Sequence, residues 1–158
     1  MTLGDNLLES LNAWRPAGES RSILSLAGGD WTVSIDAERN DSVGSLVSEM
    51  TLTRSTVDVG PIVVRPWAER VANRVTGLVE PLKVIEVDDE RNEAILRSTT
   101  PSKRGSLAQF YEVQLSGIGM ATVKRFKADT ATGTRREQVS FALTHEVISK
   151  LADDLVRD

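Results

Sequence analysis

Strand-like segments follow one another directly through most of this chain, and that order limits the fold more than any other feature. Segments 82–87 and 93–98 flank a short charged turn, and segments 107–115 and 120–128 flank a glycine-containing turn. Parallel neighbours need a crossover of a dozen or more residues, whereas antiparallel neighbours need only a short turn. We therefore predict an α+β fold with a largely antiparallel sheet, or sheets, of about seven or eight strands.

Three amphipathic segments predict helices at the N-terminus, in the middle and at the C-terminus. They cover residues 3–14, 66–78 and 145–156, and each carries Leu, Val or Trp at helical spacing on one face. Thr2 and Thr144 stand where N-cap residues are favoured. We expect these apolar stripes, with their tryptophans, to form the core.

The strand patterns predict which side chains point inward. Trp31, Val33, Ile35 and Ala37 alternate on one face of a hairpin that turns at Gly28 to Asp30, and the next strand places Leu46, Met50 and Leu52 on the face opposite Val47. If Leu115 lies opposite Met120, then Tyr111, Val113 and Phe126 share their face. We expect positive φ at Gly117 and Gly119, and an exposed loop over residues 100–105.

Length and composition favour one domain over residues 1–158. The 158 residues are 40% hydrophobic and 27% charged, as in ordinary globular domains. There is no cysteine, which excludes thiol catalysis, disulfides and iron–sulfur clusters. The first ten residues lack a basic start and an apolar run, and no apolar stretch approaches about 18 residues. We expect a soluble, cytoplasmic protein without a membrane segment.

The motifs that carry enzyme chemistry are missing. His145 is the only histidine and stands at a helix start, where the helix dipole disfavours its protonation, so we expect a structural role. The run from Ser116 to Gly119 precedes a strand and lacks the lysine of a phosphate loop. The carboxylates cluster in turns without the spacing of a calcium loop. We therefore predict no catalytic residue, no cofactor and no metal ligand.

The strongest charge feature is a basic segment at residues 97–136. It holds eight basic and two acidic residues, a net charge of +6, in a chain whose net charge is −4. We expect Arg125 and Lys127 to project together toward solvent, with Glu112 placed to pair with Arg125 and Phe110 on the same face. This arrangement predicts binding of an anionic ligand or a nucleic acid. The candidate residues are Lys103, Arg104, Arg125, Lys127, Arg135 and Arg136.

The order helix, three strands, helix, two strands from Thr2 to Ser98, with a helix at Thr144 to Val156, resembles that of secretion-chaperone-like domains. The resemblance implies a non-catalytic domain, typically a homodimer, that holds a segment of a partner protein. Our leading hypothesis is accordingly a binding module that recognises a protein segment through an exposed strand or a helix groove. The alternatives are the anion or nucleic-acid binder, and an enzyme that uses carboxylates and arginines in a cavity between sheet and helices.

Overall fold

The computed structural model describes residues 1–16, 21–55, 60–133 and 135–156. Its helices are α1 (Leu3–Ala13), α2 (Val64–Arg74) and α3 (His145–Val156). Its strands are β1 (Ser22–Gly28), β2 (Trp31–Asn40), β3 (Gly44–Arg54), β4 (Leu82–Asp88), β5 (Glu93–Ser98), β6 (Ser102–Arg104), β7 (Leu107–Ser116), β8 (Met120–Asp129), β9 (Glu137–Val139) and β10 (Phe141–Thr144). The α+β class, the antiparallel strands and the three helix positions are confirmed.

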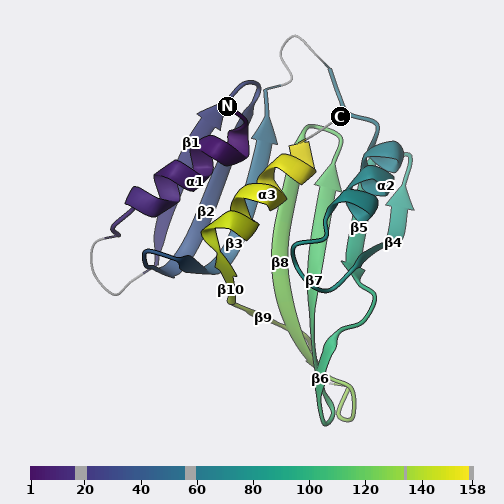
Figure 1. Cartoon of the computed structure of the whole chain (residues 1–158). Helices are drawn as coiled ribbons and strands as arrows, with labels where there is room; N and C mark the ends of the chain where they lie inside the picture. Colours follow the sequence, from purple (N-terminus) through teal and green to yellow (C-terminus); the bar gives the residue numbers. More distant parts are fainter. Residues whose placement is uncertain (17–20, 56–59, 134, 157–158) are drawn as a thin grey trace.

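The strands of the described part form one antiparallel sheet. Its main order is β1-β2-β3-β8-β7-β5-β4, with β6 beside β7, β9 beside β8 and β10 beside β3 (Figure 1). Strand β8 pairs with β3 over residues 120–123 and with β9 over residues 125–127. The segment expected as one strand at 138–143 is therefore two short strands, because its first half pairs with β8 and its second half pairs with β3.

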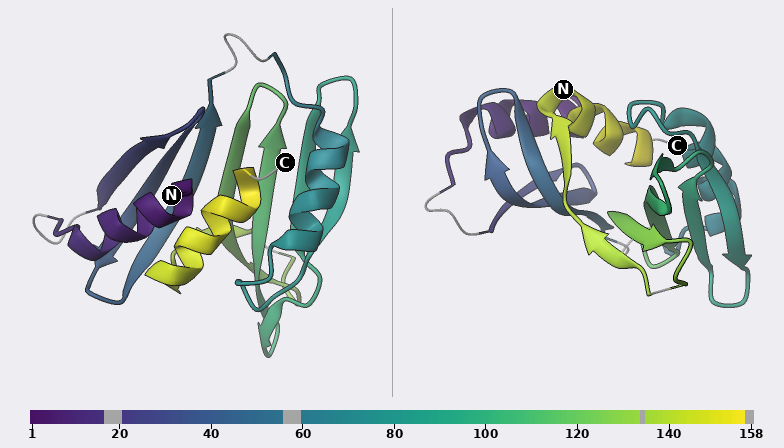
Figure 2. Two further views of the ribbon diagram at one scale, coloured as in Figure 1. Left: turned by 45° about the horizontal axis from the view of Figure 1, so that its top comes forward. Right: turned by 90° about the horizontal axis from the view of Figure 1, so that it is seen from below.

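The three helices cover one face of the sheet and leave the other face bare (Figure 2). Helix α1 packs on β1, α3 on β3 and β10, and α2 on β4, β5 and β7. Between the layers lies a core that includes Leu7, Ile35, Leu52, Val71 and Leu96, each with no exposed surface. Burying these aliphatic side chains supplies the main driving force for folding.

Helices α1 and α3 each begin at an N-cap threonine, and they pack closely against each other at Gly4. Thr2 and Asp5 form a reciprocal capping box at the start of α1, and the Thr144 hydroxyl accepts a hydrogen bond from Val147 N, as an N-cap does. At Gly4, helix α1 approaches α3 so closely that an added Cβ would lie 2.4 Å from the Ser149 carbonyl oxygen. Both N-cap predictions are confirmed.

Two local predictions fail because of neighbouring contacts. Helix α2 begins at Val64, before the expected Pro66, because the side chain of Asn92 accepts a hydrogen bond from Val64 N at 2.9 Å. The helix also ends four residues early, although Leu78 is buried as expected. The loop expected at 100–105 contains β6, which pairs with the start of β7.

A bulge in β3 changes the face of Val47. Strand β3 has one extra residue, Ser48, between the partners of Asp36 and Ala37 on β2. A bulge of this kind changes the alternation along a strand. Val47 is therefore buried with Met50 in the core, whereas the sequence pattern placed it on the opposite face.

The register of the β7–β8 hairpin differs by one residue from the expected one. Ser116, not Leu115, lies opposite Met120, so Met120 and Phe126 point to the bare face and Arg125 points to the helix side. A shift of one residue exchanges the two faces of a strand. Of the two turn glycines, Gly119 has positive φ, but Gly117 is needed because a Cβ would collide with the side chain of Asn92.

Candidate functional site

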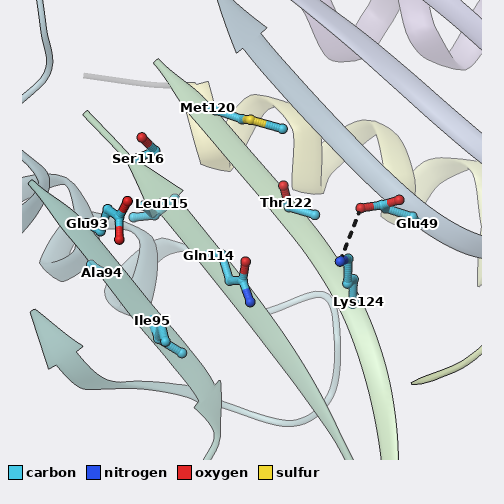
Figure 3. A pocket seen from close by; sticks show the side chains of 10 residues that line it. All are labelled: Glu49, Glu93, Ala94, Ile95, Gln114, Leu115, Ser116, Met120, Thr122 and Lys124. Atoms are coloured by element: carbon cyan, nitrogen blue, oxygen red, sulfur yellow. Dashed lines mark ion pairs between the residues drawn. The ribbon is translucent and has the colours of Figure 1, made fainter. Parts of the chain in front are cut away.

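The helix-free face carries a hollow of about 400 Å³ over β3, β8, β7 and β5 (Figure 3). Lys124 and Glu49 form an ion pair across it, with 3.5 Å between Nζ and Oε1. The other side chains named in Figure 3 are half polar and half apolar, with Ile95, Leu115 and Met120 as the larger apolar ones. The hollow therefore combines a neutralised charge pair with apolar surface, and it holds no uncompensated cation for an anion.

Beside the hollow, Glu112 is buried on the same face and is the centre of a polar cluster. Its carboxylate accepts hydrogen bonds from Arg97 Nε at 2.7 Å, from Arg136 Nη1 and Nη2 at 2.8 and 3.2 Å, and from Gln114 Nε2 at 3.0 Å. Burial alone would raise the pKa of Glu112, but the hydrogen bonds from the two arginines and the glutamine outweigh it and lower the pKa. Glu112 is thus an ionised anchor that joins β7 to β5 and to the chain before β9.

The two arginines of this cluster also cover the neighbouring aromatic rings. The guanidinium of Arg97 lies 5.7 Å from the ring centre of Phe110, and that of Arg136 lies 3.9 Å from the ring centre of Phe126. Cation–π contacts of this kind hold the arginines over the rings. Phe110 is the ring expected beside the basic side chains. The guanidinium of Arg97 already covers this ring, in the position that a stacked nucleic-acid base would take.

The structure divides the six predicted anion-binding residues between the two faces. Ladder pairing places Arg104, Arg125 and Lys127 on the helix side, and Lys103 on the bare face. Arg136 joins Glu112 on the bare face, and Arg135 is exposed next to it in the chain. These residues therefore do not share one surface.

Arg125 corrects two expectations. It is 8% exposed, so it does not project toward solvent, and it pairs with Glu80, not with Glu112, at 3.0 Å. Its guanidinium carbon lies 4.3 Å from the ring centre of Tyr111. The one-residue change in register is the cause, because it turns Arg125 to the helix side and leaves Glu112 on the other face.

His145 is buried where α1, α3 and the end of β2 meet. Its Nδ1 lies 2.7 Å from Asn12 Oδ1, and its Nε2 lies 2.7 Å from Asn40 Oδ1. The Asn40 amide nitrogen donates to the carbonyl oxygens of Leu11 and Trp14, which directs its Oδ1 toward the imidazole. Asn40 Oδ1 is thus placed to accept a hydrogen bond from Nε2, and His145 joins three elements of the fold.

The protonation of His145 follows from its surroundings. Burial lowers its pKa and outweighs the opposite effects of the Gly44 backbone and Asp41. The lowered pKa favours the neutral imidazole near pH 7, and both ring nitrogens make contacts inside the fold.

The two end strands of the main strand order, β4 and β1, differ in charge and in regularity of pairing. Edge strand β4 carries Lys83, Glu86 and Asp88, and its pairing with β5 is interrupted between Val84 and Glu86. Edge strand β1 has seven residues without a charge, and its pairing with β2 is unbroken. Charges and bulges are the usual devices that block an exposed edge, so β4 is blocked and β1 is open.

Comparison with known proteins gave no relative: no family model, no curated protein and no solved structure matches this chain. Among the described residues, no helix has the length and apolar character needed to cross a membrane. The same part of the chain has no group of three or more histidines and carboxylates that could hold a metal ion.

Proposed function

We propose that this protein binds an extended segment of another protein, which pairs with β1 as an additional strand of the sheet. The observation that carries the proposal is the contrast between β4 and β1: β4 is charged and irregular, whereas β1 is uncharged and regular and, among the described strands, pairs with β2 alone. Strand addition at an open edge is a common mode of peptide recognition. The resemblance in element order to secretion-chaperone-like domains implies the same class of function.

The hairpin geometry identifies the free backbone groups of β1. Gly28 and Trp31 close a two-residue turn and so form a hydrogen-bonded pair. Gly28 and every second residue before it form hydrogen bonds with β2. The residues between them direct their N–H and C=O groups to the outer side of β1, away from β2. The outward groups therefore belong to Ile23, Ser25 and Ala27. An extended peptide can pair with all three.

The side chains around β1 indicate what the peptide should contain. Ile23 is 65% exposed on the bare face, and Leu24 and Leu26 are half-buried on the helix side, so an added strand with apolar residues would cover all three. Helix α1 flanks β1 and exposes Asp5 and Glu9, with no basic residue in the helix. We therefore propose a partner segment with apolar residues and at least one Lys or Arg.

The same charges favour a partner segment over a second copy of this chain. Pairing of β1 with β1 of a second copy would bring two acidic α1 helices to the same side of one sheet, where their charges repel. Light scattering of the free protein should thus give the mass of a monomer, and a stable dimer would favour the second copy.

The binding test uses a labelled seven-residue peptide of alternating Leu and Thr with Lys at each end, and measures fluorescence anisotropy. In this protein, Ser25→Pro removes one outward N–H while leaving the bonds to β2, and proline is tolerated at such an edge position. Ser25→Ala is the matched control, because both variants lose the 2.8 Å contact between the Ser25 and Ser34 hydroxyls. We expect saturable binding to the wild type and Ser25→Ala, and its loss in Ser25→Pro.

Two further measurements complete the test. Thermal unfolding should show that Ser25→Pro is folded, and a peptide with Glu at each end should bind more weakly than the Lys peptide at low salt. Equal binding by Ser25→Pro and Ser25→Ala, or no binding of the Lys peptide to the wild type, would exclude strand addition at β1.

A further inference from the structure

We infer that a second site, independent of the β1 edge, binds a small oxyanion at the lower end of the sheet on the helix side. A cavity of about 350 Å³ lies there, lined by Ser102, Arg104, Leu107, Gln109 and Arg125. The ladder explains why these residues meet: Ser102 and Arg104 on β6 lie opposite Gln109 and Leu107 on β7. This volume is within the usual range of small-molecule sites, which begins at about 300 Å³.

Arg125 is fixed in the wall of this cavity. Its Nη2 binds Glu80 Oε2 at 3.0 Å, its Nε binds Gln109 Oε1 at 3.3 Å, and its guanidinium lies on the ring of Tyr111. Its Nη1 is buried and has no hydrogen-bond partner among the described residues. Buried donors are nearly always paired, so the unpaired nitrogen marks a missing acceptor beside the cavity.

Two further donors are free at the same cavity. Gln109 directs its carbonyl oxygen to Arg125, so its amide nitrogen points away and has no partner in the described part of the chain. Arg104 is exposed and makes no hydrogen bond or ion pair with any described residue. Two arginines and one amide therefore belong to the lining, and the Glu80 carboxylate, which accepts from both Ser102 and Arg125, lies outside it.

The charge balance indicates the ligand. Glu80 neutralises Arg125 from outside the lining, which leaves the charge of Arg104 uncompensated. An arginine fork and an amide donor match two or three oxygens of one phosphate or carboxylate group. The structure thus assigns the site to an oxyanion carried by a small molecule.

The position of Lys103 provides a control within the same strand. Lys103 lies opposite Ala108 and points to the other face of the sheet, so it is next to Arg104 in sequence but does not line the cavity. Replacing either residue by glutamine removes one positive charge from an exposed position. A site effect should therefore appear in Arg104→Gln alone, and a general charge effect in both variants.

The experiment titrates the 15N-labelled protein with inorganic phosphate, acetate or chloride at constant ionic strength and follows the side-chain NMR signals of Gln109, Arg104 and Arg125. We expect saturable shifts with phosphate or acetate but not with chloride, and the comparison of the two oxyanions tells phosphate from carboxylate preference. Arg104→Gln should weaken the binding at least about 10-fold, and Lys103→Gln less than about 2-fold.

Three results would overturn the assignment. They are shifts that do not saturate, equal shifts with chloride, and equal losses in Arg104→Gln and Lys103→Gln. Gln109→Leu serves as a second variant that keeps the charge: its Arg125 signal should respond less to the oxyanion, and an unchanged affinity would remove Gln109 from the site. None of these results depends on peptide binding at β1.

Discussion

Gly4 is the position where a single methyl group should do the most damage to the packing of the helices. A Cβ there would lie 2.3 Å from Asp153 Oδ2 and 2.4 Å from the Ser149 carbonyl oxygen. The carboxylate can rotate, but the carbonyl belongs to the backbone of α3 and cannot. Because an ordinary contact begins at 3.4 Å, helices α1 and α3 must separate by about 1 Å in Gly4→Ala.

The cost of that separation follows from the bonds at the crossing. Ser149 Oγ donates to Gly4 O at 2.6 Å, and Gly4 N donates to Asp153 Oδ1 at 2.8 Å. Overpacking costs about 1–3 kcal/mol, and weakening these two bonds adds about 1–3 kcal/mol. The higher helix propensity of alanine offsets about 1 kcal/mol of this loss of stability. We expect a net loss of about 1–5 kcal/mol, which for a chain of this size lowers the Tm by about 2–20 °C.

Calorimetry and urea unfolding of Gly4→Ala measure this loss directly. Gly77→Ala is the control, because its new Cβ would meet only Val147 Cγ1 at an ordinary 3.4 Å. We expect the control to stay within about 1 kcal/mol of the wild type. If Gly4→Ala is as stable as Gly77→Ala, helices α1 and α3 do not pack as closely as described.

Three further predictions concern polar anchors. Glu112→Gln should lower the free energy of unfolding by about 2–4 kcal/mol, since two arginines lose their carboxylate, whereas the exposed Glu93→Gln should change it by less than about 0.5 kcal/mol. Because the folded pKa of Glu112 lies below the ordinary glutamate value of 4.5, its stabilisation is present above that pH, and the difference from Glu112→Gln should shrink as the pH falls below it. The folded pKa of His145 lies below 6.5, so unfolding favours protonation; urea unfolding should show stability falling from about pH 7.5 to about pH 5.5, and His145→Gln should flatten this slope. Asn92→Ala should cost about 1–3 kcal/mol, because its side chain holds the start of α2, and an unchanged urea midpoint would contradict that role.

Local signals predicted the elements well, because each depends on residues close in sequence. The cap at Thr2, the hairpin that turns after Gly28 and the apolar stripe of α3 all appear where the patterns placed them. The predictions failed where a distant contact decides. Asn92 sets the start of α2 from the β4–β5 turn, and the bulge at Ser48 turns Val47 into the core.

The candidate sites show the same division. The positive charge of residues 97–136 is evident in the sequence, but the side of the sheet on which each arginine lies depends on the β7–β8 register, and one residue of shift exchanges the faces. A signal for the Glu112 cluster was present, since a lone carboxylate within a basic segment invites ion pairs. The open edge at β1 could not be recognised, because which strands end a sheet depends on the strand order.

The amino-acid sequence by itself therefore determined the three helices, most of the strands and the antiparallel pairing of neighbouring strands, because side-chain periodicity and short turns are local properties. Only the tertiary structure decided that the strands form one sheet with a bare face, that β1 is left open, and that Arg104 and Arg125 line one cavity while Arg136 lies on the opposite face. Those outcomes depend on register and strand order, which arise from pairing between segments far apart in the chain.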